Sequence, residues 1–464
     1  MIKRFNRAGI FPALFLCILL VLVTACSTSP TGSTPTPSGT GHSGPAGNSN
    51  GTPGSTPAVQ TVPMPATSTD CPALNTARAA VMRPLALGSH QNLVYIYNEV
   101  PQNTSTAIGH LRRYDATSGQ KSDIITSGIR IDQAQISADG QWVLFLSIPD
   151  PRGDSQHSAM LQLVRMDGQG LQTLYCFPSS IVYSGQGASS KLPIALQWSV
   201  DQHSILFSLN TNNDTSSIQV LNIATGNLKQ LFLDQHDALY NYSVVTWLDN
   251  IHFYIIKQGN MGPTPPATVF LMDASTATVA NPGLVQIMTT NTRMSYYSLD
   301  SSYDGTQLYN SYCLLAASPF TTNIGVGPAM GGARHTIYSQ QHGDCIQVMR
   351  AVAPNTLLMV VQVANSAGSL TSNQVWTMSL PGNSVHTLTT FATSDSTSYN
   401  LNETSQYPWS NLSRNGNAYA IAAADPTTHI QSILVAPLSG GNASSVAITN
   451  PGNSSVSVAG WTTL

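Results

Sequence analysis

One pattern recurs along this chain and limits what it can fold into: a polar turn carrying Asp or Asn leads into a short apolar strand. A second hairpin follows each copy, so each unit contains four strands. Units of four strands at a spacing of about 48 to 62 residues predict a β-propeller. The copies of the first hairpin lie at 136–148, 198–210, 247–256, 301–312 and 411–423.

The ends of the chain favour a closed ring. Residues 351–363 are a degenerate copy of the first hairpin, and 87–100 provide another at the amino end. The last stretch, 456–464, contains Trp461, which matches Trp198. Placing this stretch in the opening blade removes free sheet edges. We therefore predict an all-β fold, a β-propeller of seven four-stranded blades closed by the C-terminal strand. Six blades are the second choice, because the unit at about 294 to 350 is irregular.

Three of the turns contain dipeptides typical of tight hairpins. Asp139-Gly140, Asp304-Gly305 and Asn415-Gly416 are sequences that favour a type I′ turn, in which both central residues have positive φ. Asp201 and Asp249 hold the same place where glycine is missing. We expect these dipeptides to join the first and second strands of each blade.

The turns resemble those of the WD-repeat-like propellers of the Tol-associated (TolB-like) periplasmic family, whose blades carry a Trp-Ser-x-Asp-Gly turn. Trp198-Ser-Val-Asp201 is the copy most similar to that motif, and no copy is complete. The resemblance covers most of 88–464. It implies the propeller fold and export, and it implies protein binding.

The amino end predicts export and lipid attachment. Lys3, Arg4 and Arg7 precede an uncharged run that ends at Cys26, as in a secretory signal peptide. The segment 23–26 resembles the lipobox of bacterial lipoproteins. We expect a signal peptide at 1–25, a lipidated Cys26 with a disordered Ser/Thr/Pro/Gly tether at 26–70, and a propeller domain at 71–464. The chain would then be anchored to the outer face of the cell membrane. An uncleaved membrane helix is the alternative.

The composition of the chain limits the classes of partner that it can bind and the state of its cysteines. Only 8% of the residues are charged and no basic stripe is present, which excludes nucleic acid as a partner. Four cysteines follow Cys26, and no two of them have the spacing of a zinc or redox motif. We predict the disulfides Cys313–Cys345 and Cys71–Cys176, with buried free thiols as the alternative.

Connection lengths predict one elaborated face. Turns within hairpins are short, whereas connections between hairpins and between blades are long and reach the same face. Long loops on a rigid scaffold usually carry function. The long connections are 149–159, 177–193, 210–217, 234–243, 258–267, 317–335 and 393–408. The candidate recognition-face residues are Asp150, Arg152, Asp154, His157, Asp234, His236, Asp237, Tyr240 and Tyr242.

Motifs of common enzymes are missing from the sequence. Glutamate occurs only at Glu99 and Glu403, and no HExxH, GxSxG or P-loop is present. Gly325 and Gly327 are interpreted as flexibility in a long loop. Trp142, Trp198, Trp247 and Trp409 are expected to pack within blades, whereas Tyr183, Tyr240, Tyr242 and Tyr399 are loop aromatics that can stack on a ligand.

These observations predict a lipid-anchored, non-catalytic binding or scaffold module for an envelope protein, peptide or glycan. No catalytic residue, metal or cofactor is predicted. The alternative is a propeller enzyme, a lyase or hydrolase, with a polar site at the mouth of the central channel. That alternative requires two or more of the candidate Asp and His residues to converge near the axis.

Overall fold

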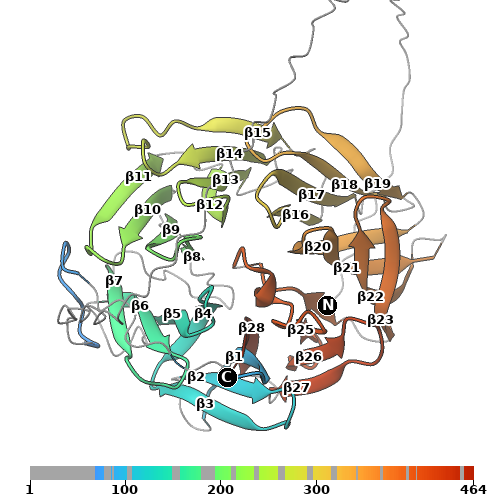
Figure 1. Cartoon of the computed structure of the whole chain (residues 1–464), viewed down its shortest axis with the longest axis horizontal. Helices are drawn as coiled ribbons and strands as arrows, with labels where there is room; N and C mark the ends of the chain where they lie inside the picture. The colour runs from blue at the N-terminus through green and yellow to red at the C-terminus, as the bar shows by residue number, and fades with distance from the viewer. Residues whose placement is uncertain are drawn as a thin grey trace, which may run out of the picture. The chain divides into compact units, whose positions relative to one another are not determined.

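A computed structural model shows seven four-stranded antiparallel sheets arranged in a ring (Figure 1). All described residues belong to the compact unit Val62–Leu464. None of the helices in this described part is long and apolar enough to cross a membrane. The structure describes residues 68–77, 85, 88–101, 107–148, 157–178, 194–210, 216–234, 240–259, 267–289, 296–314, 321–340, 343–365, 369–392, 397–403, 405–449 and 454–463.

Each sheet is one blade, whose first strand lies nearest the axis (Figure 1). Blade 1 contains β28 (Ser455–Thr463), β1 (Gln91–Glu99), β2 (Ile108–Asp115) and β3 (Lys121–Ser127). Blade 2 contains β4 (Arg130–Ile136), β5 (Trp142–Ile148), β6 (His157–Arg165) and β7 (Gln172–Pro178). Blade 3 contains β8 (Ile194–Trp198), β9 (Ser204–Asn210), β10 (Ser216–Asn222) and β11 (Leu228–Asp234). Blade 4 contains β12 (Tyr240–Trp247), β13 (His252–Gly259), β14 (Thr268–Asp273) and β15 (Val285–Thr289).

The remaining three blades follow the same order. Blade 5 contains β16 (Tyr296–Ser301), β17 (Gln307–Leu314), β18 (Thr321–Pro328) and β19 (His335–Gln340). Blade 6 contains β20 (Asp344–Ala353), β21 (Thr356–Ala364), β22 (Leu370–Ser379) and β23 (Ser384–Ala392). Blade 7 contains β24 (Ser398–Asn400), β25 (Ala418–Ala424), β26 (Gln431–Pro437) and β27 (Ser444–Ile448).

The predicted fold class is confirmed, including seven blades and closure by the last strand. β28 pairs with β1 in antiparallel register, with Trp461 opposite Leu93. Both side chains are fully buried. The strand from the carboxyl end is therefore the innermost strand of the blade built from the amino end, and it covers the edge of β1 that would otherwise be unpaired.

The unit at about 294 to 350 is more regular than its sequence suggests. The segment 317–335, predicted to be the longest loop, contains all of β18 and the turn to β19. Gly325 and Gly327 lie in β18. A Cβ at Gly325 would lie 2.8 Å from Asn310 Oδ1, and one at Gly327 would lie 2.7 Å from Arg334 Cγ. The glycines make room for these side chains, so their interpretation as loop flexibility was wrong.

The turn between the first and second strands is held by a serine and a carboxylate or amide. In blade 2, Ser137 Oγ donates to Asp139 Oδ1 and accepts from the amides of Gln141 and Trp142, at 3.1 and 3.0 Å. Gly140, at φ 75°, donates its amide to Ser137 O. In this turn Gly140 has positive φ and Asp139 does not. A type I′ turn requires positive φ at both positions, so the type I′ prediction was wrong. The same Ser-x-Asp/Asn arrangement occurs at 199–204, 302–307 and 413–418.

Tryptophans fill the spaces inside and between blades as expected. Trp142 and Trp198 belong to one buried cluster of blades 2 and 3, and Trp247 packs against Phe253 in blade 4. Trp409 is different, because it lies outside the strands in the short 3-10 helix η2 (Pro408–Ser410).

The structure contains both expected disulfides. Cys71 bonds to Cys176 in β7, and Cys313 bonds to Cys345 across blades 5 and 6. Near the first disulfide, the amide of Thr173 donates to Ser68 O at 2.8 Å. The segment that precedes the propeller is therefore fastened to the outer strand of blade 2.

Replacing Ser137 with Ala tests the turn. The variant leaves the buried amide of Trp142 without its acceptor, whereas the amide of Gln141 keeps Asp139 Oδ1, and we expect the free energy of unfolding to fall by about 1 to 3 kcal/mol. Chemical denaturation measures the change. Ser444→Ala, at an exposed position, is the control and should change it by less than about 0.5 kcal/mol. Equal effects of the two substitutions would contradict this account of the turn.

Candidate functional site

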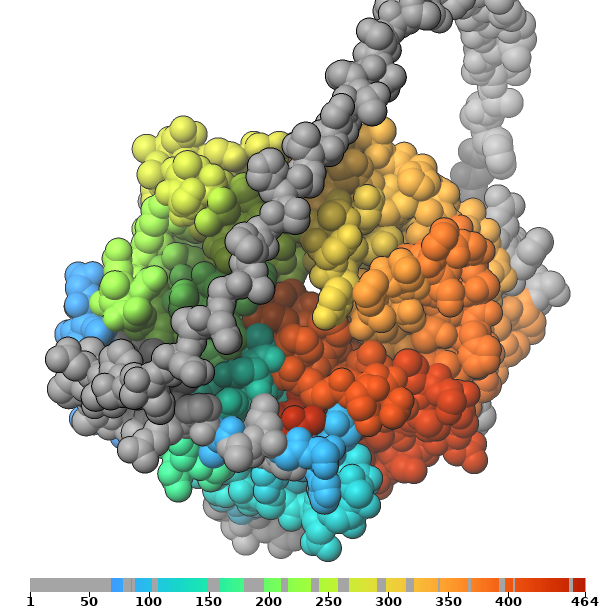
Figure 2. Space-filling view, in the orientation of Figure 1, coloured from blue at the N-terminus to red at the C-terminus, as the bar shows by residue number. Residues whose placement is uncertain are grey.

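The connection from β24 to β25, residues 401–417, differs from the other connections between first and second strands because it is long and carries η2. In Figure 1 this red connection extends into the middle of the ring, and Figure 2 shows red side chains occupying that position. Its Gln406 and Tyr407 side chains reach blade 3, where they donate to the carbonyls of Trp198 and Ser199. We name 401–417 the channel plug.

A buried ion pair holds the beginning of the channel plug. Arg350 in β20 donates from Nε to Asp300 Oδ2 at 2.9 Å, and both side chains are 4% exposed. The two terminal nitrogens of Arg350 donate to Asn402 O and Ser405 O. Burial raises the pKa of Asp300, and the Arg350 guanidinium opposes that rise. One guanidinium thus joins blades 5, 6 and 7 inside the channel.

Glu403 lies beside this pair. Its Oε1 accepts from Ser298 Oγ of β16 at 3.0 Å. The carboxylate contacts solvent in the channel, but protein surrounds it on most sides, and this burial raises its pKa. Ser298 also bonds to the backbone of Met349, so its hydroxyl is engaged in holding blades 5 and 6 together.

The end of the channel plug is held by a stacked column. The Tyr407 and Trp409 rings are parallel, with centroids 4.6 Å apart, and the Arg414 guanidinium lies 3.9 Å from the Trp409 centroid. Arg414 donates to the carbonyls of Trp461 and Ser137. Burial lowers the pKa of Arg414 to about 10. Arg414 thereby fixes blade 7 to blades 1 and 2.

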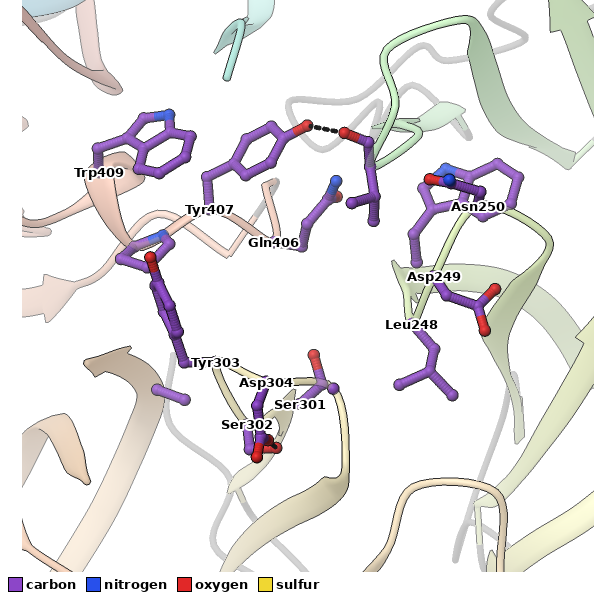
Figure 3. A pocket seen from close by; sticks show the side chains of 15 residues that line it. Leu248, Asp249, Asn250, Ser301, Ser302, Tyr303, Asp304, Gln406, Tyr407 and Trp409 are labelled. Atoms are coloured by element: carbon purple, nitrogen blue, oxygen red, sulfur yellow. Dashed lines mark hydrogen bonds between the residues drawn. The ribbon is translucent and has the colours of Figure 1, made fainter. Parts of the chain in front are cut away.

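A pocket of about 400 Å³, which we name the channel-mouth pocket, lies between the channel plug and the turns of blades 3, 4 and 5 (Figure 3). It is at the end of the ring that carries the turns between first and second strands, which we name the short-turn face. The lining residues are Val200, Trp247, Leu248, Asp249, Asn250, Ser301, Ser302, Tyr303, Asp304, Gly305, Ala351, Gln406, Tyr407, Pro408 and Trp409.

Aromatic side chains form much of the pocket wall. Tyr303 is 57% exposed and holds the variable position of the blade 5 Ser-x-Asp-Gly turn. The channel plug contributes Tyr407, whose hydroxyl donates to Val200 O at 3.1 Å (Figure 3). Burial raises the pKa of Tyr407, so this hydroxyl stays protonated as a donor. The wall thus combines one stacked aromatic pair with one exposed ring.

The two carboxylates of the pocket are already engaged in turns. Desolvation opposes ionisation of Asp249, but hydrogen bonds from His252 and from the amide of Ile251 outweigh it and lower the pKa. Bonds from Ser302 Oγ and from the amide and hydroxyl of Thr306 lower the pKa of Asp304. Both groups are therefore ionised acceptors, and neither is a proton donor at neutral pH.

Gln406 provides a polar atom without a described partner. Its Nε2 donates to Trp198 O at 2.9 Å, whereas its buried Oε1 has no hydrogen-bond partner among the described residues. Buried polar side-chain atoms without a partner are uncommon in folded proteins.

Most residues predicted for the recognition face lie outside the described residues. These are Asp150, Arg152, Asp154, His236 and Asp237, together with Tyr183 and Cys26. The recognition face therefore stays a prediction for them. The described parts of the long connections 149–159, 210–217, 234–243 and 258–267 are the ends of strands.

The predicted residues that the structure does describe lie in strands. Asp234 ends β11, the outermost strand of blade 3, and His157 begins β6. Tyr240 begins β12, and Tyr242 in the same strand is buried against Phe232. The prediction of Tyr240 and Tyr242 as loop aromatics was wrong, because they continue the inner strand of blade 4.

The segment 393–408 was also divided incorrectly. It contains the short strand β24 and the start of the channel plug, so only part of it links two blades. Tyr399 lies in β24 and is buried against Phe391. The signal that could have identified the plug is the sequence Tyr407-Pro408-Trp409, two aromatic residues beside a proline in a segment without strand alternation.

Titratable residues are not gathered into a metal site in the described part of the chain. No group of three or more His, Cys, Asp or Glu side chains among these residues could hold a metal ion.

Comparison with known proteins identifies the fold. No protein-family model and no curated protein sequence match the chain. Similar solved structures include a putative TolB from Agrobacterium tumefaciens, 14% identical over 76% of this chain and 99% of that one, with TM-score 0.38. The periplasmic gluconolactonase PpgL of Pseudomonas aeruginosa is 11% identical over 79% and 99%, with TM-score 0.48.

A structure from a study of two prolyl endopeptidases is 11% identical over 80% of this chain, with TM-score 0.50. The match covers 50% of that chain, so the present protein spans about half its length. At these identities the likeness is one of fold.

Replacing Arg350 with Met tests how the channel plug is held. The variant leaves Asp300 buried without its cation, and we expect the free energy of unfolding to fall by about 3 to 5 kcal/mol. Denaturant titration measures this. The double variant Asp300→Asn/Arg350→Met should recover part of the loss. Arg112→Met, which removes a more exposed ion pair with Asp123, should cost no more than about 1 kcal/mol. A cost as small for Arg350→Met would contradict the anchoring role.

Proposed function

We propose that this protein is an extracytoplasmic, lipid-anchored β-propeller that binds an envelope protein, peptide or glycan at the channel-mouth pocket without transforming it. The observation that carries the proposal is the composition of the pocket. Its wall presents the exposed Tyr303 ring beside the channel plug, and its two carboxylates are committed to turns (Figure 3).

The chemistry of the pocket favours binding over catalysis. A general acid or base works best when its pKa lies near the working pH. The pKa values of Asp249 and Asp304 are lowered instead, so these groups accept hydrogen bonds and stay charged. Tyr303 offers an amphipathic ring for stacking, and the ionised Asp249 and Asp304 offer acceptors. A ligand with a flat or apolar surface and hydroxyl or amide donors matches these groups.

Export and anchoring are supported by separate features. The two disulfides Cys71–Cys176 and Cys313–Cys345 suit an oxidising compartment outside the cytoplasm. The lipobox-like sequence that ends at Cys26, followed by the Ser/Thr/Pro/Gly segment to residue 70, supports a lipid anchor with a tether. Two acyl chains are sufficient for durable membrane attachment.

Replacing Tyr303 with Ala tests the pocket. Glycan and peptide arrays probed with the full chain provide the ligand, and calorimetry measures its dissociation constant. Loss of an aromatic anchor at the centre of a site typically costs 1 to 2 kcal/mol or more, so we expect Kd to rise about tenfold. Leu370→Ala, which removes another exposed apolar side chain on blade 6, should leave Kd unchanged.

The same experiment separates binding from catalysis. Ligand recovered after prolonged incubation should have its original mass. A cleaved or eliminated product that forms with the wild type and disappears in Tyr303→Ala would establish the enzyme alternative, the lyase or hydrolase, in place of the binding module.

Replacing Cys26 with Ser tests the anchor. Cells fed a clickable palmitate analogue should label the wild-type chain, whereas Cys26→Ser should carry no label and leave the membrane fraction. The control is Cys17→Ser, within the apolar run, which should label normally. Equal labelling of the wild type and Cys26→Ser would exclude lipidation at this residue.

A further inference from the structure

The turns between the third and fourth strands of blades 4 and 5 are unusually apolar. Residues 274–284 in blade 4 contain no charged side chain, and they include Val279, Ala280, Pro282 and Leu284. The corresponding turn of blade 5, 329–334, reads Ala-Met-Gly-Gly-Ala-Arg. Both turns lie on the short-turn face, outside the channel-mouth pocket.

Four large apolar side chains at this place are exposed to solvent. Ile251 is 43% exposed, Val279 44%, Val285 54% and Met330 53%. Ile251 belongs to the turn between β12 and β13, and Val285 is the first residue of β15. We name these four residues the blade 4/5 patch.

The segments that carry the patch touch one another. The amide of Ala274 donates to Ile251 O at 2.7 Å, which joins the two turns of blade 4. The blade 5 turn lies against β15, because a Cβ on Gly331 would be 3.2 Å from Ile287 Cδ1. Tyr254 Oη in blade 4 donates to Ala329 O at 2.8 Å. The segments that carry the four exposed side chains are therefore neighbours on the short-turn face.

Charges distinguish the two borders of the patch. On the side facing the channel, Asp249 and Asp304 stand in the turns of blades 4 and 5, with no described Lys or Arg in those turns. On the outer side, two cations donate to neutral oxygens and keep their positive charge. Lys229 Nζ donates to Ala274 O and Ser275 O, and Arg334 donates to Leu308 O and an amide oxygen. The inner border is therefore negative and the centre is apolar.

We propose that the blade 4/5 patch is a second docking surface, for a protein segment that places apolar side chains on Val279, Val285 and Met330 and a lysine or arginine near Asp249 and Asp304. Apolar burial supplies most of the affinity, and the carboxylates fix the direction of the segment. The surface is adjacent to the channel-mouth pocket and shares Asp249 and Asp304 with it, whereas Val279, Val285 and Met330 lie outside the pocket lining. A lipid surface suits it less, because no cluster of Lys and Arg accompanies the apolar turns.

Two synthetic 12-residue peptides test this proposal. They share a core of Leu, Ile and Phe, and they differ in flanking residues, which are Lys in one and Glu in the other. Fluorescence anisotropy with the full chain should show binding of the Lys-flanked peptide, and at least about tenfold weaker binding of the Glu-flanked one. Failure of the chain to bind the Lys-flanked peptide, or equal binding of both, overturns the proposal.

Substitutions locate the binding. Val279→Asp/Met330→Asp should weaken the Lys-flanked peptide at least about tenfold, because it places charge in the apolar centre. Ile448→Asp is the matched control, since Ile448 is 59% exposed at the end of β27 in blade 7, and it should bind as the wild type does. For Tyr303→Ala, the Kd of the Lys-flanked peptide should stay within about twofold of the wild-type value. This result would distinguish the blade 4/5 patch from the channel-mouth pocket. Equal losses in all three variants overturn the proposal.

A measurement without substitution covers the case in which the double variant does not fold. In a sample with 13C-labelled methionine methyl groups, the Lys-flanked peptide should shift the Met330 resonance and leave that of Met378 unchanged, since Met378 is fully buried in blade 6. An unshifted Met330 resonance at saturating peptide overturns the proposal. Two other outcomes also overturn the proposal. One is that the wild-type chain sediments with phosphatidylcholine vesicles and Val279→Asp/Met330→Asp does not. The other is that the wild-type chain self-associates and this double variant does not.

Discussion

The pairing of β28 with β1 is the interaction on which the rest of the structure depends. It joins the two ends of the domain in one sheet and closes the ring around a channel. The same strand holds the channel plug. Asn402 Nδ2 donates to Val458 O at 2.9 Å, Trp461 Nε1 donates to Asn411 O at 3.2 Å, and Arg414 Nε donates to Trp461 O at 3.0 Å. The strand that closes the ring, β28, therefore also holds the channel plug in place.

The two ends of the ring have different roles. The short-turn face is built from self-contained Ser-x-Asp/Asn turns, in which the side chains satisfy the backbone amides of the turn. This arrangement leaves the second position of each turn free to vary. It is Val200 in blade 3 and Tyr303 in blade 5, which line the pocket, and Arg414 in blade 7, which packs on Trp409. A constant turn frame thus carries side chains that differ from blade to blade.

Much of the fold could be predicted from the sequence, because it is repeated. Turn residues such as Asp139-Gly140, and alternating apolar strands, act within a few residues and recur in each blade. β18 was missed because its glycines weaken the strand signal, and their purpose, to accommodate Asn310 and Arg334, depends on contacts between strands. The disulfide Cys313–Cys345 was predicted from closeness in sequence, and Cys71–Cys176 followed as the remaining pair, although Cys313 and Cys345 belong to two blades and not to one unit.

The candidate site was predictable only in part. A polar site at the channel mouth was considered as the alternative, but the residues assigned to recognition lie in other parts of the chain. The channel plug depends on Arg350 and Asp300, which come from different blades and are 50 residues apart in sequence. No local pattern indicates that such residues meet. Similarly, Tyr303 has the sequence of an ordinary turn residue, and only the folded ring places it in one pocket with Trp409.

Hydrogen–deuterium exchange on the full chain, with and without a ligand from the arrays, tests the central claim most directly. The account predicts added protection of backbone amides at 301–306 and 405–410, where the blade 5 turn and the channel plug form the pocket. It predicts no change in peptides covering the long connections 149–156 and 179–193. Protection confined to those long connections, with 301–306 and 405–410 unchanged, would contradict a binding site at the channel mouth.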